Sequence, residues 1–184
     1  MLLEHFGLFL FVKLAQFQEF MSNNKIDLSL ISNSTEKINP NFVYLTQTDH
    51  INAVLLLSKN PVLFVSSLET SIAEENSKIR NIKVLNKNFF ENINKLKPKI
   101  IGIDKNYTTL SQFRTLKKNL KKVKFKDISQ QIPKLRAIKT EDEINLIKKS
   151  CNYADLVMQE AMAFAGKAKT EIDLKKYIEK KILD

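Results

Sequence analysis

The sequence is poor in cysteine, glycine, proline and tryptophan. Its 184 residues include one cysteine, three glycines, four prolines and no tryptophan. A single cysteine, Cys151, excludes an internal disulfide framework and a cysteine-based zinc site, and it fits a reducing compartment. With so few glycines and no stretch rich in glycine and serine, the composition argues against a flexible linker and against disorder.

Long apolar segments are also missing. The longest apolar stretch, Phe6 to Val12, is far shorter than the roughly 20 residues that a membrane span requires. No basic residue precedes it, and Glu4 stands where a signal peptide carries positive charge. We therefore expect a cytoplasmic protein without a membrane partner. Its 43% hydrophobic and 27% charged residues suit a soluble chain with one well-packed core.

Basic residues are in excess, and many of them crowd into one segment. The formal net charge is +10. A lysine run could bind nucleic-acid phosphates, but this one lacks the interleaved aromatic residues that stack bases. Lysines also suit a solvated helix end and a strand edge, so we favour that explanation and do not expect nucleic acid as a partner. The run comprises Lys117, Lys118, Lys121, Lys122, Lys124 and Lys126.

Helices and short strands alternate along most of the chain. Apolar residues at helical spacing, from Leu10 to Met21, predict an amphipathic first helix. Residues 32–40 are expected to form a polar loop. This order predicts an α/β fold, with a sheet layered by helices. Strands are expected at 26–31, 53–57, 62–65, 82–85, 100–103 and 123–125, and helices at 67–77, 89–96 and 110–120.

Two longer helices are predicted at the end. Thr140 and Glu143 form a capping box, and Thr170 is expected to cap the second helix. An apolar stripe follows the capping box and ends before Gly166. The sequence offers no further strands on which this stripe could pack, so we expect the chain to self-associate or to bind a partner. The stripe comprises Ile144, Ile147, Cys151, Ala154, Met158, Ala161 and Ala165.

The residues around this capping box carry a family resemblance. The segment from Leu135 to Ile144, LRAIKTEDEI, resembles the L-R-x-I-K-[ST]-x-x-E-I junction of the creatinase/prolidase/aminopeptidase P family. In that family the junction leads from an N-terminal domain into the first helix of a "pita-bread" catalytic domain. The chain looks most similar to archaeal-type Xaa-Pro dipeptidases, although Gln47 replaces a frequent glycine. Further matches are Cys151–Asp155, Thr170-Glu171, Ile26-Asp27, Tyr44-Leu45-Thr46 and Ile101-Gly102-Ile103-Asp104.

The resemblance implies a fold and a division of the chain. It implies an apolar N-terminal extension at 1–12 and a creatinase/prolidase N-terminal-like domain with a mixed sheet at 13–133. Residues 134–184 would be the truncated start of the pita-bread domain. The family's complete enzymes use two divalent metals (Mn, Co or Zn), held by two aspartates, a histidine and two glutamates that follow the second pita-bread helix. We therefore expect no catalytic, metal-binding or cofactor-binding residue here, and an inactive chain on its own.

Other residues with catalytic chemistry have simpler explanations. His5 and His50 lack the spacing of a two-histidine metal motif. Glu141-Asp142-Glu143 stands at a helix start, where capping explains it, and Glu74-Glu75 suits a solvated helix face. Cys151 lies on the apolar stripe, so we expect a buried structural thiol.

The resemblance also implies a function. The chain would be the N-terminal, non-catalytic portion of a metallopeptidase that cleaves proline-containing peptides, contributing fold, oligomer contacts and cover for the substrate pocket. Its expected partner is a second copy of itself or a second polypeptide that carries the catalytic half. Two alternatives stay open, a stand-alone protein-binding module of the same fold and a basic nucleic-acid-binding protein. A split or truncated gene would leave such a sequence.

Overall fold

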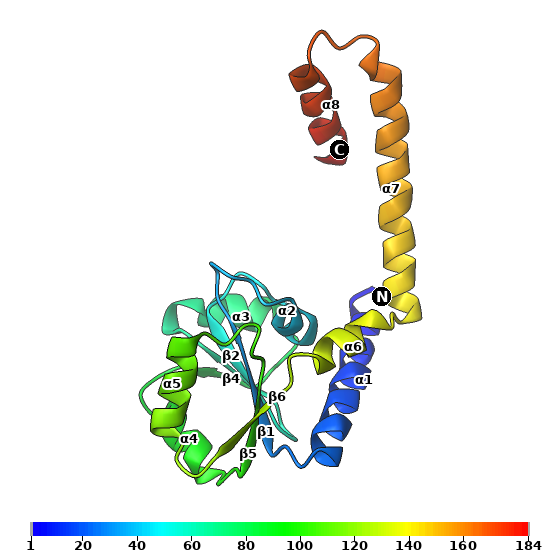
Figure 1. Cartoon of the computed structure of the whole chain (residues 1–184). Coiled ribbons are helices and arrows are strands. Elements are labelled where there is room, and N and C mark those ends of the chain that lie inside the picture. Colours follow the sequence, from blue (N-terminus) through cyan, green and yellow to red (C-terminus); the bar gives the residue numbers. More distant parts are fainter. Residues whose placement is uncertain (1, 184) are drawn as a thin grey trace. The chain divides into compact units, whose positions relative to one another are not determined.

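The computed structural model describes residues 2–183, with side chains described from Val12 onward. The chain divides after Ile138 into two compact units. In the first unit, helices cover both faces of a twisted sheet (Figure 1). Its elements are α1 Leu2–Asn23, β1 Leu28–Asn33, α2 Pro40–Thr46, β2 Ala53–Leu57, β3 Val62–Val65, the 3-10 turn η1 Ser67–Glu69, α3 Thr70–Asn76, β4 Ile82–Val84, α4 Phe89–Lys95, β5 Ile100–Ile103, α5 Leu110–Asn119, β6 Lys124–Asp127 and α6 Gln131–Ala137.

The sheet is mixed, as the resemblance implies. Its strand order is β4-β3-β2-β1-β5-β6, and β2 runs antiparallel to both of its neighbours. The pairs β1–β5, β3–β4 and β5–β6 are parallel. Five strands therefore end at the same edge of the sheet, which we call the carboxyl edge; the opposite edge is the amino edge.

Alternating residues of the strands feed two separate cores. On one face, Ile31 and Leu55 pack with α1, α2, α3 and α6, and Phe17 and Phe42 are fully buried there. On the other face, Leu30 and its neighbours pack with α4 and α5. Because successive side chains of a strand point to opposite faces, β1 serves both cores with consecutive residues.

Gly102 permits a close approach at the centre of the sheet. It lies opposite Ser29 in the β1–β5 register. A Cβ on Gly102 would overlap the Ser29 hydroxyl and come within 3.0 Å of Ile128 Cγ2. The Ser29 hydroxyl is itself buried without a hydrogen-bond partner. A larger residue at position 102 would therefore push β1, β5 and the segment after β6 apart.

All six expected strands are present, although the bounds of β1, β4 and β6 differ from those expected by one or two residues. The short helices expected at 67–77 and 89–96 are also present, as η1 with α3 and as α4. The bounds of β2, β3 and β5 are those expected from the sequence. The expected loop at 32–40 is wrong at both ends, because β1 continues to Asn33 and α2 begins at Pro40. Asn39 caps α2, and Pro40 occupies its first position; both are helix-start signals. Helix α6 was also missed, and it contains Pro133, at which the first domain was expected to end.

The second unit consists of two antiparallel helices, α7 Glu141–Ala165 and α8 Glu171–Leu183 (Figure 1). The predicted capping box is present, with Thr140 N donating to Glu143 Oε2 at 2.9 Å. Thr170 begins α8 through reciprocal bonds with Asp173. Stacked rings of Phe164 and Tyr177, with centroids 4.2 Å apart, join the two helices.

The predicted domain boundaries stay predictions. Residues 2–12 belong to α1, and the side chains up to residue 11 lie outside the described residues. The boundary expected after residue 133 falls within α6, whereas the compact units divide after Ile138. Within the described residues, none of the helices combines the length and the apolar character needed to cross a membrane.

Candidate functional site: the junction anchor and the apolar helical face

The residues that sequence reasoning considered for chemistry do not come together. His50 is exposed beside Asp49, with Nε2 3.5 Å from Oδ2, and the side chain of His5 lies outside the described residues. Cys151 is exposed, so the expectation of a buried thiol is wrong. Helix α8 packs along the side of α7 that carries Ala154 and Ala161, and this leaves Cys151 uncovered.

The acidic candidates do not form a metal centre. Glu143 accepts hydrogen bonds in the capping box of α7, while Glu74 and Glu75 are exposed on α3. Among the described side chains, from Val12 to Leu183, no three histidine, cysteine, aspartate or glutamate residues gather where they could hold an ion. A dinuclear centre needs several such ligands around two ions, so the described residues do not fit one. That the chain contributes no catalytic or ligand residue stays a prediction.

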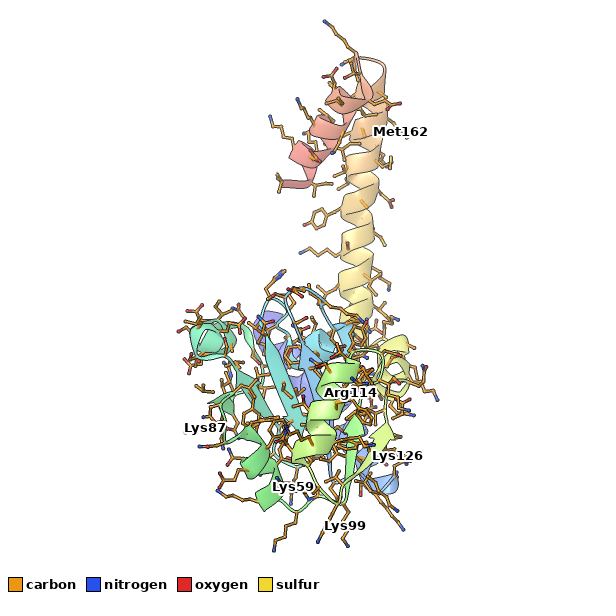
Figure 2. The ribbon with its side chains drawn as sticks, turned by 60° about the vertical axis from the view of Figure 1, so that its left-hand side comes forward. Lys59, Lys87, Lys99, Arg114, Lys126 and Met162 are labelled. Atoms are coloured by element: carbon orange, nitrogen blue, oxygen red, sulfur yellow. The ribbon has the colours of Figure 1, made fainter. Side chains whose placement is uncertain are left out.

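The lysine run occupies the end of helix α5 and the outermost strand, β6. Lys117 and Lys118 lie in the last turn of α5, and β6 is the outermost strand on its side of the sheet. Lys126 Nζ donates to Asn24 Oδ1 at 2.8 Å, and its place at this edge is marked in Figure 2. Lys117 lies over the ring of Phe113. Part of the run thus has local partners within the first unit.

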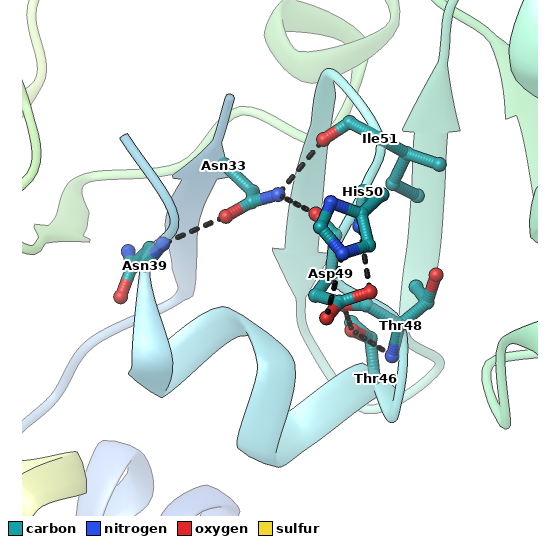
Figure 3. Close-up of polar contacts among 7 residues, drawn as sticks. All are labelled: Asn33, Asn39, Thr46, Thr48, Asp49, His50 and Ile51. Carbon is teal, nitrogen blue, oxygen red and sulfur yellow. Dashed lines mark hydrogen bonds and ion pairs between the residues drawn. The ribbon is translucent and has the colours of Figure 1, made fainter. Parts of the chain in front are cut away.

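Sequence reasoning missed a network of asparagines at the carboxyl edge. The Asn33 amide group donates to the carbonyls of Asp49 and Ile51, at 2.6 and 2.8 Å (Figure 3). Its Oδ1 accepts from Asn39 N at 2.7 Å. One buried side chain therefore ties the loops on both sides of α2 to the end of β1. The frequent asparagines of the chain hid this signal, because spacing alone does not separate these two from the others.

A second cluster fastens the end of the first unit. Asn41 Nδ2 donates to Asp104 Oδ2 at 2.8 Å, and both residues are buried. Arg136 Nη1 donates to Asn41 Oδ1 at 3.1 Å, and its guanidinium lies 5.9 Å from the ring centroid of Tyr44. Lys13 Nζ donates to the carbonyls of Leu135 and Ile138, at 3.2 and 3.0 Å.

These contacts form what we call the junction anchor: Lys13, Asn41, Asp104 and Arg136. It joins α1, α2 and the end of β5 to α6, the last helix of the first unit. Arg136 belongs to the junction motif seen in the sequence. The anchor explains why a basic residue stands there, since a planar guanidinium can donate a hydrogen bond and also cover an aromatic ring.

The second unit presents an extensive apolar surface. Exposed fractions are 88% at Leu183, 71% at Met162 and 59% at both Tyr153 and Met158. A groove of about 380 Å³ between α7 and α8 is lined by side chains such as Val157 and Ile178. Among the described residues of this unit, Ala161 alone is buried. Large exposed apolar patches are typical of surfaces that contact another protein, and a role for this one is proposed below.

Comparisons with known proteins agree with the division of the chain after Ile138. Residues 13–138 match the family model described as the creatinase/prolidase N-terminal domain. The chain is 30% identical over 172 residues to an Xaa-Pro dipeptidase of Pyrococcus furiosus, covering 91% of this chain and 47% of that protein. It is 28% identical over 171 residues to an Xaa-Pro dipeptidase of Pyrococcus horikoshii, covering 91% and 46%.

Solved structures give the same picture. The crystal structure of the prolidase from Pyrococcus horikoshii OT3 superposes with a TM-score of 0.73 at 28% identity, over 92% of this chain and 47% of that one. The match includes the first unit and extends into the second. The chain spans about half the length of the curated relatives that it matches.

Proposed function

Because the chain belongs to the creatinase/prolidase N-terminal domain family, we propose that it serves as the non-catalytic N-terminal part of an Xaa-Pro dipeptidase-like metallopeptidase. The observation that supports this most is the extent of the match. It covers nearly all of this chain but under half of each dipeptidase relative. The remainder of such an enzyme would hold the metals and hydrolyse the bond before proline.

In this proposal the first unit supplies a rigid base. Its two cores are complete within the chain, and the junction anchor fixes the end from which α7 continues. The loops fastened by Asn33 at the carboxyl edge are held by buried hydrogen bonds. Such fastened loops suit the two further roles that we propose, contact with a second subunit and cover for the substrate pocket.

The second unit would be the docking element for the catalytic half. The relatives are about twice as long as the part matched, and the apolar face of α7 and α8 lacks a covering layer among the described residues. We therefore assign this face to the polypeptide segment that follows in such relatives. A separate polypeptide that carries this segment would dock in the same way.

A peptidase assay tests the proposal. The chain is assayed on a proline-containing dipeptide with added manganese or cobalt, alone and mixed with a polypeptide that covers the missing half. Activity in the mixture alone is the expected result, whereas activity of the chain by itself would contradict the non-catalytic role. The absence of peptidase activity from both the chain alone and the mixture would favour the stand-alone binding module.

Two neighbouring positions of α7 provide a matched pair of variants. Met158 and Gln159 are both exposed. If the apolar face docks the catalytic half, Met158→Asp should abolish the complemented activity, and Gln159→Asp should leave most of it. Equal losses would show that charge, rather than the apolar face, decides the outcome. Without the catalytic half, we expect the chain to self-associate, and a monodisperse monomer at micromolar concentration would count against that.

A further inference from the structure

The first unit contains a cavity that the proposed function does not use. It measures about 550 Å³ and opens between α4 and α5, on the second face of the sheet. Figure 2 labels Lys87 just before α4 and Arg114 on α5, the helices that flank it. Leu30 and Val54 contribute from the strands, and Phe89, Phe90 and Leu116 from the helices. The cavity therefore has a broad apolar wall.

One end of the cavity is polar. Ser32 follows Leu30 near the end of β1, and Thr108 lies in the loop after β5, so this end coincides with the carboxyl edge. Ser111 and Thr115 add hydroxyl groups from α5. Lys87, exposed in the loop after β4, supplies the charge. None of the described residues that line the cavity is acidic.

The size and the lining of the cavity are those of a small-molecule site. Such sites span roughly 300–1,000 Å³ and combine apolar walls with a few polar groups. Ligands of open α/β sheets bind in the crevice beyond the carboxyl ends of the strands. The cavity satisfies all three criteria of size, lining and position.

We propose that this cavity binds a small amphipathic carboxylate. Its aryl or alkyl body lies against Phe89, Phe90 and Leu116, and its carboxylate is directed to Lys87 and the neighbouring hydroxyl groups. The charge complementarity rests on one unpaired cation and on a lining without acidic groups. The site lies wholly within the first unit, so it does not depend on the catalytic half.

A second cavity of similar size provides the internal control. It measures about 520 Å³ and lies at the amino edge, where Lys59 and Lys83 share the lining with Asp27. The carboxylate of Asp27 accepts from the backbone amides of Lys99 and Ile100, at 2.7 Å each. An acidic group thus offsets the lysines there. A neutral substitution of Lys83 therefore serves as the control, because it removes one positive charge from this second cavity and leaves the first unchanged.

The test uses the full chain and three probes that differ only in their polar end. Phenylbutyrate, phenylbutanol and phenylbutylamine are titrated into isotope-labelled protein, and amide chemical shifts report where each binds. Phenylbutyrate should shift the residues of α4 and α5 saturably at millimolar concentration. It should bind about five times more tightly than the alcohol, the effect of one exposed charge-assisted contact, and the amine should bind least.

Substitutions then locate the binding. Lys87→Gln should weaken phenylbutyrate about fivefold, to the level of the alcohol, whereas Lys83→Gln should not change it. Thr115→Phe fills the cavity and should abolish binding, while Arg114→Phe adds the same bulk outside it. Helical circular dichroism confirms that each variant folds, and Lys87→Gln tests the proposal even where Thr115→Phe does not.

Three results would overturn the proposal. The first is that phenylbutyrate shifts no residue of α4 or α5 at millimolar concentration. The second is that the alcohol binds as tightly as the acid, which would leave Lys87 without a role. The third is that the shifts map to α7 and α8, which would show capture by the exposed apolar face instead.

Discussion

The two compact units of this chain differ most in how they treat their apolar side chains. In the first unit, residues such as Phe17, Ile31 and Leu55 are completely buried within two cores. In the second, Leu156, Met162 and Leu183 are exposed by 57%, 71% and 88%. The first unit therefore gains stability from burial within itself.

The second unit depends on weaker local interactions. Reciprocal capping bonds begin both of its helices. Lys181 Nζ forms an ion pair with Glu160 Oε2 at 2.9 Å. Such features contribute little by themselves, because helices in proteins are stabilised mainly by packing of an apolar face. The first unit thus buries its apolar residues within itself, whereas most of the described apolar residues of α7 and α8 are exposed, which is why we propose that a further polypeptide segment covers them.

The largest expected effect is the loss of a buried leucine in the first unit, compared with the loss of an exposed leucine in the second. Leu55→Ala removes a fully buried side chain from the central part of the sheet and should lower the free energy of unfolding by about 3 kcal/mol. The same substitution at Leu156, which is 57% exposed, should change it by less than about 0.5 kcal/mol. Urea denaturation followed by circular dichroism measures both. Similar losses at the two positions would mean that α7 is already packed.

A second substitution tests the close packing of the first unit. Gly102→Ala should destabilise it by about 2 kcal/mol, because the added Cβ overlaps the Ser29 hydroxyl. Ser29→Ala alone should be close to neutral, since it removes a buried hydroxyl that has no partner. The double variant should recover part of the loss. Additive losses in the double variant would place the strain elsewhere, for example against Ile128.

A third substitution tests whether the junction anchor holds α6, the last helix of the first unit. Arg136→Met keeps the stem of the side chain but removes the hydrogen bond to Asn41 and the contact with Tyr44. We expect a loss of about 1 kcal/mol, seen as faster hydrogen exchange in α6. Lys134→Met, on an exposed position of the same helix, is the control. Unchanged exchange in the Arg136 variant would show that the anchor does not hold α6.

The smallest effect concerns acid stability of the first unit. Burial by itself would raise the pKa of Glu69, but hydrogen bonds from Ser66 and Asn52 outweigh it and lower this pKa below its usual value. A carboxylate with a lowered pKa stabilises the fold above its unfolded-state pKa, and this contribution is lost as the pH falls through the folded-state pKa.

Glu69→Gln should therefore flatten part of the decline in unfolding free energy at acidic pH, below the ordinary pKa of 4.5. Urea unfolding at a series of pH values measures this decline. Glu75→Gln, at an exposed position on α3, is the control. If both variants follow the wild-type curve, the hydrogen bonds to Glu69 do not contribute to acid stability.

How much the sequence predicts depends on the kind of feature. Apolar runs such as 53–57 and 100–103 predicted their strands because a short, continuous apolar run between polar segments is typical of a buried strand. The capping box at Thr140 was equally readable, since both partners lie within four residues. Helices α2 and α6 have seven residues each and were missed, although α3 and α4, which have the same length, were expected from the sequence.

The sites were harder to predict than the elements. In the junction anchor, Asn41 contacts Asp104 and Arg136, which follow it in the sequence by 63 and 95 positions. Local spacing in the sequence therefore cannot predict these contacts. The cavity beside Lys87 depends on how α4 and α5 lie on the sheet, which only the fold determines. Cys151 was mispredicted because an apolar stripe in the sequence does not reveal whether a covering layer is present.

Hydrogen exchange of α7 and α8 tests the central claim most directly. The chain is labelled alone and with a polypeptide that corresponds to the part of the Xaa-Pro dipeptidase relatives beyond the match. We predict that exchange in α7 and α8 slows at least about tenfold on mixing, which corresponds to about 1.4 kcal/mol, while the core strands of the first unit do not change. Strong protection of both helices before mixing, or no change after it, would contradict the proposed docking of this face.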